Sequence, residues 1–450
     1  MKRVFKDATI ITMNSNRECY QDGGLVVEDA TISKVGRVCP EDLATADEVI
    51  SLPGRVILPG LVNTHVHTSQ QLARGLGDDV SVFTWFYNRI WPFESHMTEE
   101  DSYISTLLSA CELIRSGVST FAEAGGQYIN GMGKAVTQAG IRGILTRSVM
   151  DIGEGPMKML DPVEKLMASQ EEMLDLWHNQ ANGRIKVWFA LRTLLNNSEK
   201  LVLKTFQLAE KHGVGVHMHL SEILEEVEVI RKRAGFSPVG YLAQLGALVP
   251  YLLAVHAVWL SEEDINLLAT HDVKVSHNPA AALRVLGFPK VTEMMARGIC
   301  VGLGTDGAPS NNRMNILDEM WLTTLLQKGR LHDPMAMPAE TVLQMATIDG
   351  ARCLHWENEI GSLEKGKKAD FVVLNPNTVG MMPVHDLVSN IVNSMHSDNV
   401  ESLVVDGLFV LKEGKVLTIA EDDVIKESGE RARAIAKRAE IHLTPRFPLC

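Results

Sequence analysis

Hydrophobic residues recur along this chain in two rhythms, one near both ends and another in the middle. Near the ends, short segments alternate between apolar and polar residues and are separated by glycine and aspartate, which is typical of a small antiparallel sheet. Because chain ends often meet at a protein surface, the two groups of segments can form one unit. The predicted strands lie at residues 3–12, 24–28, 31–35, 369–374, 401–407 and 408–414.

The middle of the chain contains near-continuous apolar runs of strand length that alternate with amphipathic segments. Several of these segments begin with helix-start signals, such as Thr98-Glu-Glu-Asp and Ser261-Glu-Glu-Asp. Eight buried strands alternating with helices is the pattern of a (β/α)₈ barrel. A doubly wound open sheet is the alternative, because the number of strands does not prove closure. The runs lie at residues 55–63, 119–123, 142–147, 185–191, 214–220, 252–257, 273–277 and 300–306.

The two rhythms together predict an α/β protein. Its centre is a (β/α)₈ TIM barrel, and a small β-sandwich domain is built from both chain ends. The predicted bounds are 1–57 and 359–420 for the two parts of the β-sandwich, 58–358 for the barrel, and 421–450 for a C-terminal helix and tail.

Composition narrows the classes of partner and the compartment. The chain of 450 residues has a formal net charge of −13 and lacks a basic stripe, which argues against nucleic acid as a partner. Its six cysteines form no CxxC motif or regular framework, which favours reduced thiols and a cytoplasmic location. No signal peptide and no run of 18 apolar residues is found, so no membrane association is expected.

Candidate chemistry lies where the predicted barrel strands end, which is where barrel enzymes carry their active sites. The first strand leads into His65-Val-His67, and residues two apart on a strand point to the same face, so that the two histidines can share a metal ion. Alone, this pair is weak evidence, because most such pairs are ordinary surface or core histidines.

Four later strand ends add further polar residues. His277 could simply bond to the backbone, and Asp306 could cap the following helix. Those explanations do not account for histidine or aspartate at so many strand ends, so the joint placement favours a common site. The segments are His217-Met-His219-Leu-Ser-Glu222, His256, His277-Asn278 and Thr305-Asp306-Gly307.

Three histidines and one carboxylate, with a position left for water, suit zinc or another divalent first-row metal. Such an ion would lower the pKa of bound water to about 7 and supply hydroxide at neutral pH. Glu222 lies three residues beyond His219 and can carry a proton from that water to a leaving nitrogen. Taken alone, Glu222 would fit a carboxylate in the first turn of a helix better than a catalytic group.

A set of longer motifs resembles the amidohydrolase superfamily. Within it, the chain looks most like the branch of 5-methylthioadenosine/S-adenosylhomocysteine deaminases and of s-triazine deaminases and chlorohydrolases. The resemblance extends from the first strand to about residue 420. The motifs are Leu58-Pro-Gly-Leu-Val-Asn-Thr-His-Val-His67, His219-Leu-Ser-Glu222, Ser276-His-Asn-Pro279, and residues 304–312 and 361–370.

This resemblance implies one divalent metal ion, with zinc as the first choice and iron or manganese as alternatives. Glu222 would be the catalytic acid and base, and His256 would orient the hydroxide or polarise the substrate. Asp306 would be both a metal ligand and a catalytic group. The implied metal ligands are His65, His67, His219 and Asp306.

The resemblance also implies substrate contacts. Glu94 matches a carboxylate that grips ribose hydroxyls in the nucleoside deaminases, although it could equally be an exposed carboxylate at a helix start. Arg147 matches an arginine of their pocket. Arg192 stands where these deaminases have a histidine, and an arginine is always charged. It could engage the substrate or pair with Glu94 or Glu222. An arginine there also excludes the carboxylated lysine that bridges two metals in binuclear relatives.

The predicted function is metal-dependent hydrolytic deamination of an aminated nitrogen heterocycle, a small molecule. The first candidate is an adenine nucleoside such as 5′-methylthioadenosine or S-adenosylhomocysteine, which Glu94 favours. The alternative is a free aminated ring (guanine-like, pterin or s-triazine), which Arg192 favours. A non-catalytic structural relative is a third reading, against which the retained ligand set and Glu222 argue. A homo-oligomer is expected.

Overall fold

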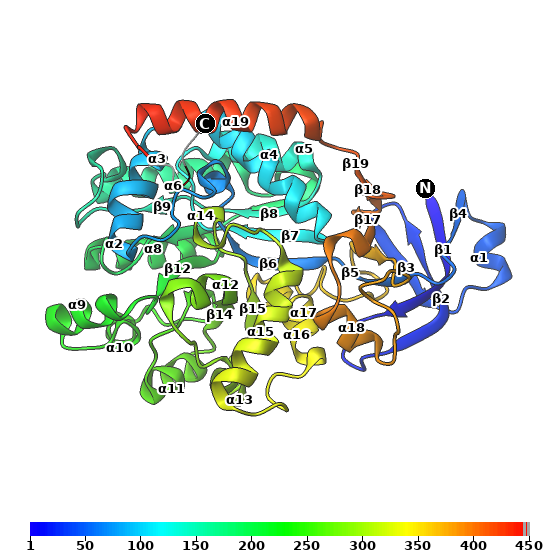
Figure 1. Cartoon of the computed structure of the whole chain (residues 1–450). Helices are drawn as coiled ribbons and strands as arrows, with labels where there is room; N and C mark the ends of the chain where they lie inside the picture. The colour runs from blue at the N-terminus through cyan, green and yellow to red at the C-terminus, as the bar shows by residue number, and fades with distance from the viewer. Residues whose placement is uncertain (444–446, 448–450) are drawn as a thin grey trace.

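Parallel strands in the middle of the chain close into a barrel in the computed structural model, which describes residues 1–443 and residue 447 (Figure 1). Hydrogen bonds order these strands as β10-β8-β7-β6 and β15-β14-β13-β12-β11-β9. Short interruptions separate β8 (Arg142–Leu145) from β9 (Ser148–Val149), and β10 (Ile185–Val187) from β11 (Phe189–Leu191). The others are β6 (Leu61–Val66), β7 (Val118–Glu123), β12 (Val216–Leu220), β13 (Leu252–His256), β14 (Lys274–His277) and β15 (Val301–Leu303).

The last barrel strand meets the first, which is what distinguishes a barrel from an open sheet. Just beyond β15, the backbone N–H groups of Thr305 and Asp306 both donate to the carbonyl oxygen of His65 on β6, each at 3.0 Å. The hydroxyl of Thr64 also donates to the carbonyl of Leu303 at 2.9 Å. The predicted TIM barrel is confirmed.

Helices between the strands form the outer layer, and the helix-start signals of the sequence mark where several begin. Thr98 and Ser261 each form a capping box with an aspartate three residues later, at the first turns of α4 and α11. The main helices are α4 (Glu99–Arg115), α5 (Ile129–Ala139), α6 (Val163–Trp177), α8 (Glu199–His212), α9 (Leu224–Ala234), α10 (Pro238–Gln244), α11 (Glu262–Thr270), α13 (Val291–Ala296), α15 (Ile316–Leu331), α16 (Ala339–Met345) and α17 (Ile348–Cys353).

The two ends of the chain combine in one unit at the side of the barrel, as predicted, and the strands of this unit are hydrogen-bonded into one nine-stranded sheet. Its blue N-terminal and orange C-terminal strands lie side by side in Figure 1. The rings of Phe5 and Phe371 meet edge to face, 4.9 Å between centroids, in the core of this unit. The strands are β1 (Lys2–Ile11), β2 (Cys19–Glu28), β3 (Thr31–Gly36), β4 (Glu48–Ser51), β5 (Val56–Pro59), β16 (Phe371–Leu374), β17 (Val400–Val405), β18 (Leu408–Lys412) and β19 (Lys415–Val416).

The apolar run at residues 55–63 forms two strands instead of one. β5 pairs with β16 in the terminal sheet, whereas β6 pairs with β7 in the barrel. Gly60 lies between them, and a side chain there would collide with Ser119. Because both halves are continuously apolar, the hydrophobic pattern alone does not reveal the division. The predicted domain bounds at residues 57 and 358 remain a prediction.

A buried ion pair joins the barrel to the terminal sheet. Arg142, at the start of β8, donates from Nε to Oδ2 of Asp370 at 2.6 Å and also pairs with Asp406. The side chains of Arg142 and Asp370 are both 1% exposed. Asp370, the last residue of one of the family-like motifs, therefore has a structural role far from the strand ends that carry the histidines.

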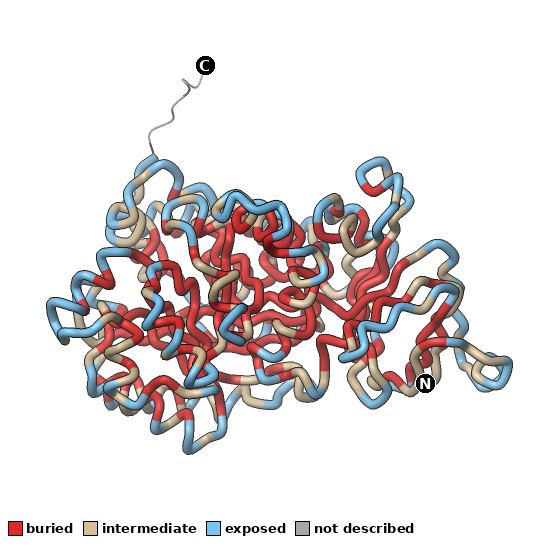
Figure 2. The backbone as a smooth tube through the Cα atoms, turned by 90° about the horizontal axis from the view of Figure 1, so that it is seen from below, coloured by how far each residue is buried: buried red, intermediate tan, exposed pale blue. Residues whose placement is uncertain are grey.

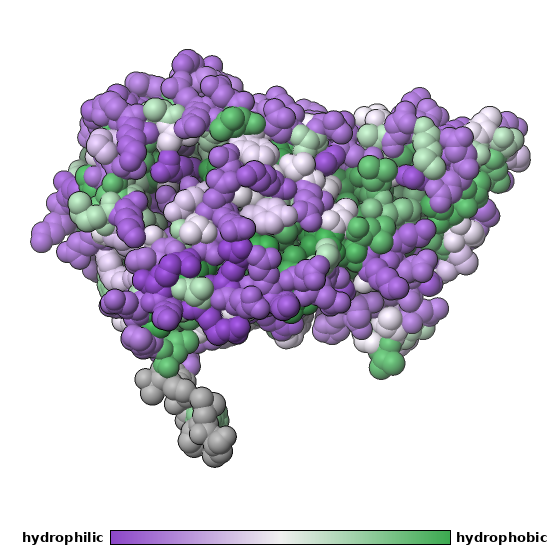
Figure 3. Space-filling view, turned by 90° about the horizontal axis from the view of Figure 1, so that it is seen from above, coloured by the Kyte–Doolittle hydropathy of each residue, from purple (hydrophilic) through white to green (hydrophobic). Residues whose placement is uncertain are grey.

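The C-terminal helix α19 (Glu421–Arg438) lies along α4, and Arg431 and Arg438 both pair with Asp101. Buried residues fill the barrel and the inner face of the terminal sheet (Figure 2). The face seen from the α19 side is largely hydrophilic (Figure 3).

None of the helices in the described part combines the length and apolarity that a membrane span needs. The five described cysteines are free thiols, and Cys450 lies outside the described residues.

Candidate metal centre

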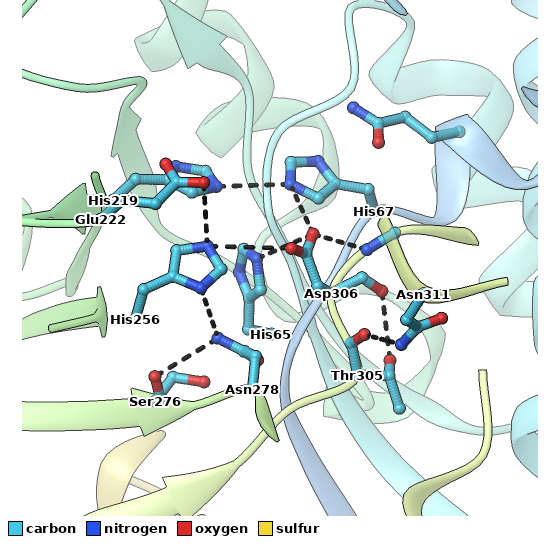
Figure 4. Close-up of polar contacts among 12 residues, drawn as sticks. His65, His67, His219, Glu222, His256, Ser276, Asn278, Thr305, Asp306 and Asn311 are labelled. Atoms are coloured by element: carbon cyan, nitrogen blue, oxygen red, sulfur yellow. Dashed lines mark hydrogen bonds and ion pairs between the residues drawn. The ribbon is translucent and has the colours of Figure 1, made fainter. Parts of the chain in front are cut away.

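Five side chains from four strands converge at the carboxyl ends of the barrel strands (Figure 4). His65 and His67 come from the end of β6, His219 from β12, His256 from β13, and Asp306 follows β15. All five residues are buried, with exposures of 5% or less. The parallel arrangement explains the meeting, because all strands of a barrel end at the same face.

The four predicted metal ligands present their donor atoms to one another. Oδ1 of Asp306 lies 3.5 Å from Nε2 of His65 and 3.5 Å from Nε2 of His67. Nε2 of His219 lies 3.3 Å from Nε2 of His67. Such a cluster of lone pairs is unfavourable without a cation, and three imidazole nitrogens with one carboxylate are a donor set for a divalent first-row metal. The residues present therefore fit one metal ion.

Hydrogen bonds on the outer side of two imidazoles fix which nitrogen faces the cluster. His219 donates from Nδ1 to the carbonyl oxygen of Arg192 at 3.0 Å, which leaves the lone pair on Nε2. Nδ1 of His65 lies 3.0 Å from Nε2 of His217, while Nε2 of His65 has no hydrogen-bond partner among the described residues. His217 is thus a positioning residue for His65.

Burial keeps these histidines neutral, which is the form that binds metals. Removal from water lowers the pKa of His65 to about 3 and, with the charges of neighbouring residues, lowers the pKa of His67 and of His219 well below their usual range. Burial also raises the pKa of Asp306, against the opposing effect of His256. A cation in the cluster would favour the ionised carboxylate.

His256 differs from the other histidines in its protonated nitrogen. The amide Nδ2 of Asn278 donates to the Ser276 carbonyl at 3.4 Å, and lies 3.3 Å from Nδ1 of His256. Because the Asn278 amide donates a hydrogen bond to Nδ1 of His256, Nδ1 carries no proton and the ring proton is on Nε2. That nitrogen faces Oε1 of Glu222 at 3.7 Å and Oδ2 of Asp306 at 3.8 Å. His256 is therefore placed as a hydrogen-bond donor beside the ligand cluster.

Glu222 is a buried carboxyl group that faces the cluster without belonging to the proposed ligand set. Burial, together with the charges of Asp306 and Glu226, raises its pKa to about 8. Its carboxyl group can therefore both hold and release a proton near neutral pH, as a general acid and base must.

Left-handed backbone occurs at several of the strand ends that carry the site. The φ angles are +51° at Ser221, +69° at His256 and +60° at Asp306. Non-glycine residues in this region are strained and occur preferentially at functional sites. The turns direct the side chains of Glu222 and Asp306 into the same space.

Arg192 lies at the end of the fourth barrel strand, as predicted, and faces Glu94. Its Nη2 is 3.8 Å from Oε2 of Glu94, and Gln70 donates to the other carboxylate oxygen of Glu94 at 2.9 Å. Both ionic side chains are buried. Nη1 of Arg192 and Oε2 of Glu94 have no hydrogen-bond partner in the described part of the chain. Arg192 and Glu94 thus form an ion pair that is too long for a hydrogen bond, and each side chain keeps a buried polar atom without a partner among the described residues.

Two cavities meet at Glu222. One is lined by Glu222, Asp306 and mainly apolar residues, including Val82, Trp85 and Leu286. The other is lined by Arg192, Glu222, Glu226 and aromatic residues that include Tyr87 and Trp91. The two cavities provide an apolar and a polar wall, which is the composition expected of a site for a heterocyclic ligand.

Arg147 is the predicted site residue that the structure does not bring into this group. It lies between β8 and β9, and the charged or ionisable groups acting on it are Asp161, Glu172 and Tyr128. It does not line either cavity. Its predicted role in substrate binding remains a prediction.

Four contributing residues were not recognised as such from the sequence. His217 and Asn278 orient other histidines, Gln70 binds Glu94, and Glu226 accepts a hydrogen bond from the backbone of Glu222. His217 and Asn278 do stand within the motifs that were singled out. The sequence carries no comparable signal for Gln70, which acts through a contact with a residue 24 positions away.

The chain is similar to one protein family and to curated deaminases over most of its length. Residues 56–410 match the model of the amidohydrolase family. A 5′-deoxyadenosine deaminase of Methanobrevibacter smithii is 35% identical over 427 residues, which cover 94% of this chain and 96% of the relative. A 5-methylthioadenosine/S-adenosylhomocysteine deaminase of Desulforamulus reducens is 36% identical over 439 residues, covering 96% and 99%.

The fold of this chain also matches that of a solved deaminase structure. An adenosine deaminase from Xanthomonas campestris with bound zinc superposes with a TM-score of 0.91 at 25% sequence identity, covering 98% of this chain and 99% of that one. The match extends over the barrel and the terminal sheet together.

Proposed function

This chain belongs to the amidohydrolase family, and from that premise we propose that it is a hydrolytic deaminase of an adenine nucleoside. The observation that carries the proposal is the convergence of His65, His67, His219 and Asp306 beside the buried carboxyl group of Glu222. Relatives that share about a third of the residues are named for deamination of adenine nucleosides, which supports this substrate class.

A metal ion belongs to this site, and we propose zinc, with iron or manganese as alternatives. His65, His67, His219 and Asp306 would hold it. When bound, a divalent ion supplies a Lewis acid that makes water reactive at neutral pH. The zinc in the related adenosine deaminase structure supports the choice of metal.

The residues of the chain would divide the remaining work. Glu222 would take a proton from the attacking water and deliver it to the amino group, so that ammonia leaves and the ring keeps an oxygen. His256, which carries its proton on Nε2, would donate a hydrogen bond to the oxygen of the attacking water as that water gives its proton to Glu222. Arg192 and Glu94 would bind the part of the substrate remote from the amino group.

The contact between Arg192 and Glu94 favours a second candidate. A carboxylate that is hydrogen-bonded to Gln70 and lies 3.8 Å from an arginine has part of its charge balanced within the protein, and an arginine fork suits ring acceptors. A free aminated ring of the guanine-like, pterin or s-triazine class is therefore the alternative substrate.

A panel of aminated compounds assayed for ammonia release tests the proposal. It should contain adenosine, 5′-deoxyadenosine, 5′-methylthioadenosine, S-adenosylhomocysteine, guanine, a pterin and an aminated s-triazine. The proposal predicts the highest kcat/KM on an adenine nucleoside. Highest activity on a free ring would give precedence to the alternative, and a metal-bound protein without activity on any member would refute both.

Replacement of Arg192 by histidine is expected to change substrate preference. The substitution removes a permanent charge and a fixed fork of donors from the cavity wall, so relative kcat/KM values across the panel should change by about tenfold, the effect of ~1.4 kcal/mol. The measurement is the ratio of kcat/KM between nucleosides and free rings. Unchanged ratios would make Arg192 a structural partner of Glu94 only.

Replacement of Glu94 by alanine tests the contact with a sugar. Charge-assisted hydrogen bonds contribute roughly 1.5–3 kcal/mol. Loss of the carboxylate should therefore lower kcat/KM for a ribonucleoside by about tenfold or more, and affect a 2′,3′-dideoxynucleoside or free base much less. Glu94→Gln is the matched variant, because it keeps the side-chain shape against Arg192. Equal losses on ribosylated and free-base substrates would contradict the nucleoside proposal.

We further propose that the protein acts in the cytoplasm on a small molecule, without nucleic acid or membrane as a partner, and that it assembles as a homo-oligomer. The free state of the five described cysteines supports a reducing compartment. Size-exclusion chromatography with light scattering would measure the oligomeric state.

A further inference from the structure

We infer that Glu226, a buried carboxylate on α9, is a positioning residue that holds Glu222 in its working place. The inference rests on the proposed function of Glu222 as the acid and base. Glu226 lies four residues beyond Glu222, in the first turn of α9, and is 1% exposed.

The first contact of Glu226 is with the backbone of Glu222. Oε2 of Glu226 accepts a hydrogen bond from the backbone N–H of Glu222 at 2.9 Å. The carbonyl oxygen of Ser221, on the other side of the same peptide unit, accepts from the N–H groups of Val258 and Trp259 at 3.1 and 3.0 Å. The peptide that carries Glu222 is thus held from both sides, directly after the strained φ of Ser221.

The helix that carries Glu226 also contacts the loop after the fourth barrel strand. Burial raises the pKa of Glu226 to about 7, while the backbone N–H groups of Glu222, Leu194 and Ser221 stabilise its charged form. Leu194 is two residues beyond Arg192. On the same helix, Arg233 donates from Nη2 to the carbonyl oxygen of Leu194 at 2.7 Å. Because residues seven apart share a helix face, Glu226 and Arg233 lie on the same side of α9.

These contacts couple two parts of the site that lie on different strands. Glu222 follows β12, whereas Arg192 follows β11, and α9 contacts the backbone of both segments, through Glu226 at Glu222 and through Arg233 at Leu194. A displacement of even 1 Å at a catalytic group lowers turnover strongly, because proton transfer needs a short, aligned path. Loss of Glu226 should therefore lower kcat through Glu222.

The second carboxylate oxygen of Glu226 is compatible with an alternative role, which is direct contact with the substrate. Oε1 has no hydrogen-bond partner among the described residues, and Glu226 lines the cavity that contains Arg192. If Oε1 touched substrate, Glu226 would be a binding residue. Its effects would then appear mainly in KM, and neutralising the carboxylate would be as damaging as removing it.

Kinetics of Glu226→Gln and Glu226→Ala in the metal-loaded, full-length protein separate these roles. The glutamine carbonyl can still accept the Glu222 N–H, so Glu226→Gln should stay within about threefold of the wild type, whereas Glu226→Ala should lose about 10–100-fold in kcat, with metal content retained. Asp264→Ala is the control. Asp264 is also buried and accepts a backbone N–H, that of Ser261, at 2.9 Å, but it caps α11. The Asp264→Ala variant should have a lower melting temperature and an unchanged kcat.

Hydrogen exchange adds a readout independent of activity. Amides in the peptide containing residues 220–224 should exchange faster in Glu226→Ala than in wild type, and those of Glu226→Gln should resemble wild type. Wild-type kcat in Glu226→Ala, or a KM defect in Glu226→Gln as large as that in Glu226→Ala, would overturn the inference. Absence of deaminase activity in the wild type would instead refute the proposed function, while the exchange experiment would still test the contact.

Discussion

Replacing His219 with alanine should release the metal ion and lower turnover by about 10³-fold, because a Lewis acid contributes several kcal/mol and each ~1.4 kcal/mol is a factor of ten. Nε2 of His219 lies 3.3 Å from Nε2 of His67, and its Nδ1–H is bound to the Arg192 carbonyl at 3.0 Å. The imidazole is therefore fixed with its lone pair toward the cluster. Metal content by elemental analysis and kcat on the preferred substrate are the two measurements.

A histidine outside the cluster provides the control for this variant. His178 is half-buried, and its Nδ1 accepts the backbone N–H of Val187 near the beginning of the fourth barrel strand, opposite the metal site. His178→Ala should keep one metal ion per chain and normal turnover, with at most a lower melting temperature. A fully active His219→Ala enzyme without metal would refute the mechanism.

The proposed metal ligands could be located in the sequence because barrel geometry brings together residues that are far apart in the chain. His65 and Asp306 are separated by more than half of the chain, yet each stands at the end of an apolar run. Once the runs are assigned to parallel strands of a barrel, their ends must meet. No distance information is needed for that step, and the structure places the four residues together.

Contacts of single side chains could not be predicted in the same way. Arg192 was expected at the end of the fourth strand with three possible partners, namely Glu94, Glu222 and the substrate. The structure places its Nη2 3.8 Å from Glu94, a residue of the segment between β6 and α4 whose conformation has no periodic signal in the sequence. Gln70 and Glu226 each act through a single hydrogen bond that no pattern in the sequence indicates.

The burial that protects the cluster from water also divides the site into groups with different proton affinities. Removal from water favours the uncharged form of every group, so imidazoles lose affinity for protons whereas carboxyl groups gain it. The pKa of His256 is thereby lowered to about 3 and that of Glu222 is raised to about 8. His256 and Glu222, whose side chains lie 3.7 Å apart, therefore have distinct roles. His256 is a neutral hydrogen-bond donor, and Glu222 carries the proton.

Glu222→Gln should retain the metal ion and lower kcat by about 10²–10⁴-fold, the range attributed to general acid–base catalysis. Glutamine keeps the size of the side chain and an oxygen that can accept hydrogen bonds, but its amide cannot take up a proton from water and deliver it to the leaving nitrogen. KM should change little, because the cavity keeps its shape. Initial rates of ammonia release and metal content on the same preparation measure both parts of the expectation.

Glu319→Gln is the matched control for Glu222→Gln. Glu319 is buried on α15 and accepts the backbone N–H of Ala280 at 2.9 Å, a hydrogen bond that the glutamine carbonyl can also accept. The loss of a carboxylate at this second buried position should leave turnover within a few-fold of wild type, since no proton transfer depends on it. If Glu222→Gln lost its metal ion, Glu222 would be a ligand or its support. If it kept both metal and full turnover, the proton would travel by another route, and His256 would be the next residue to test.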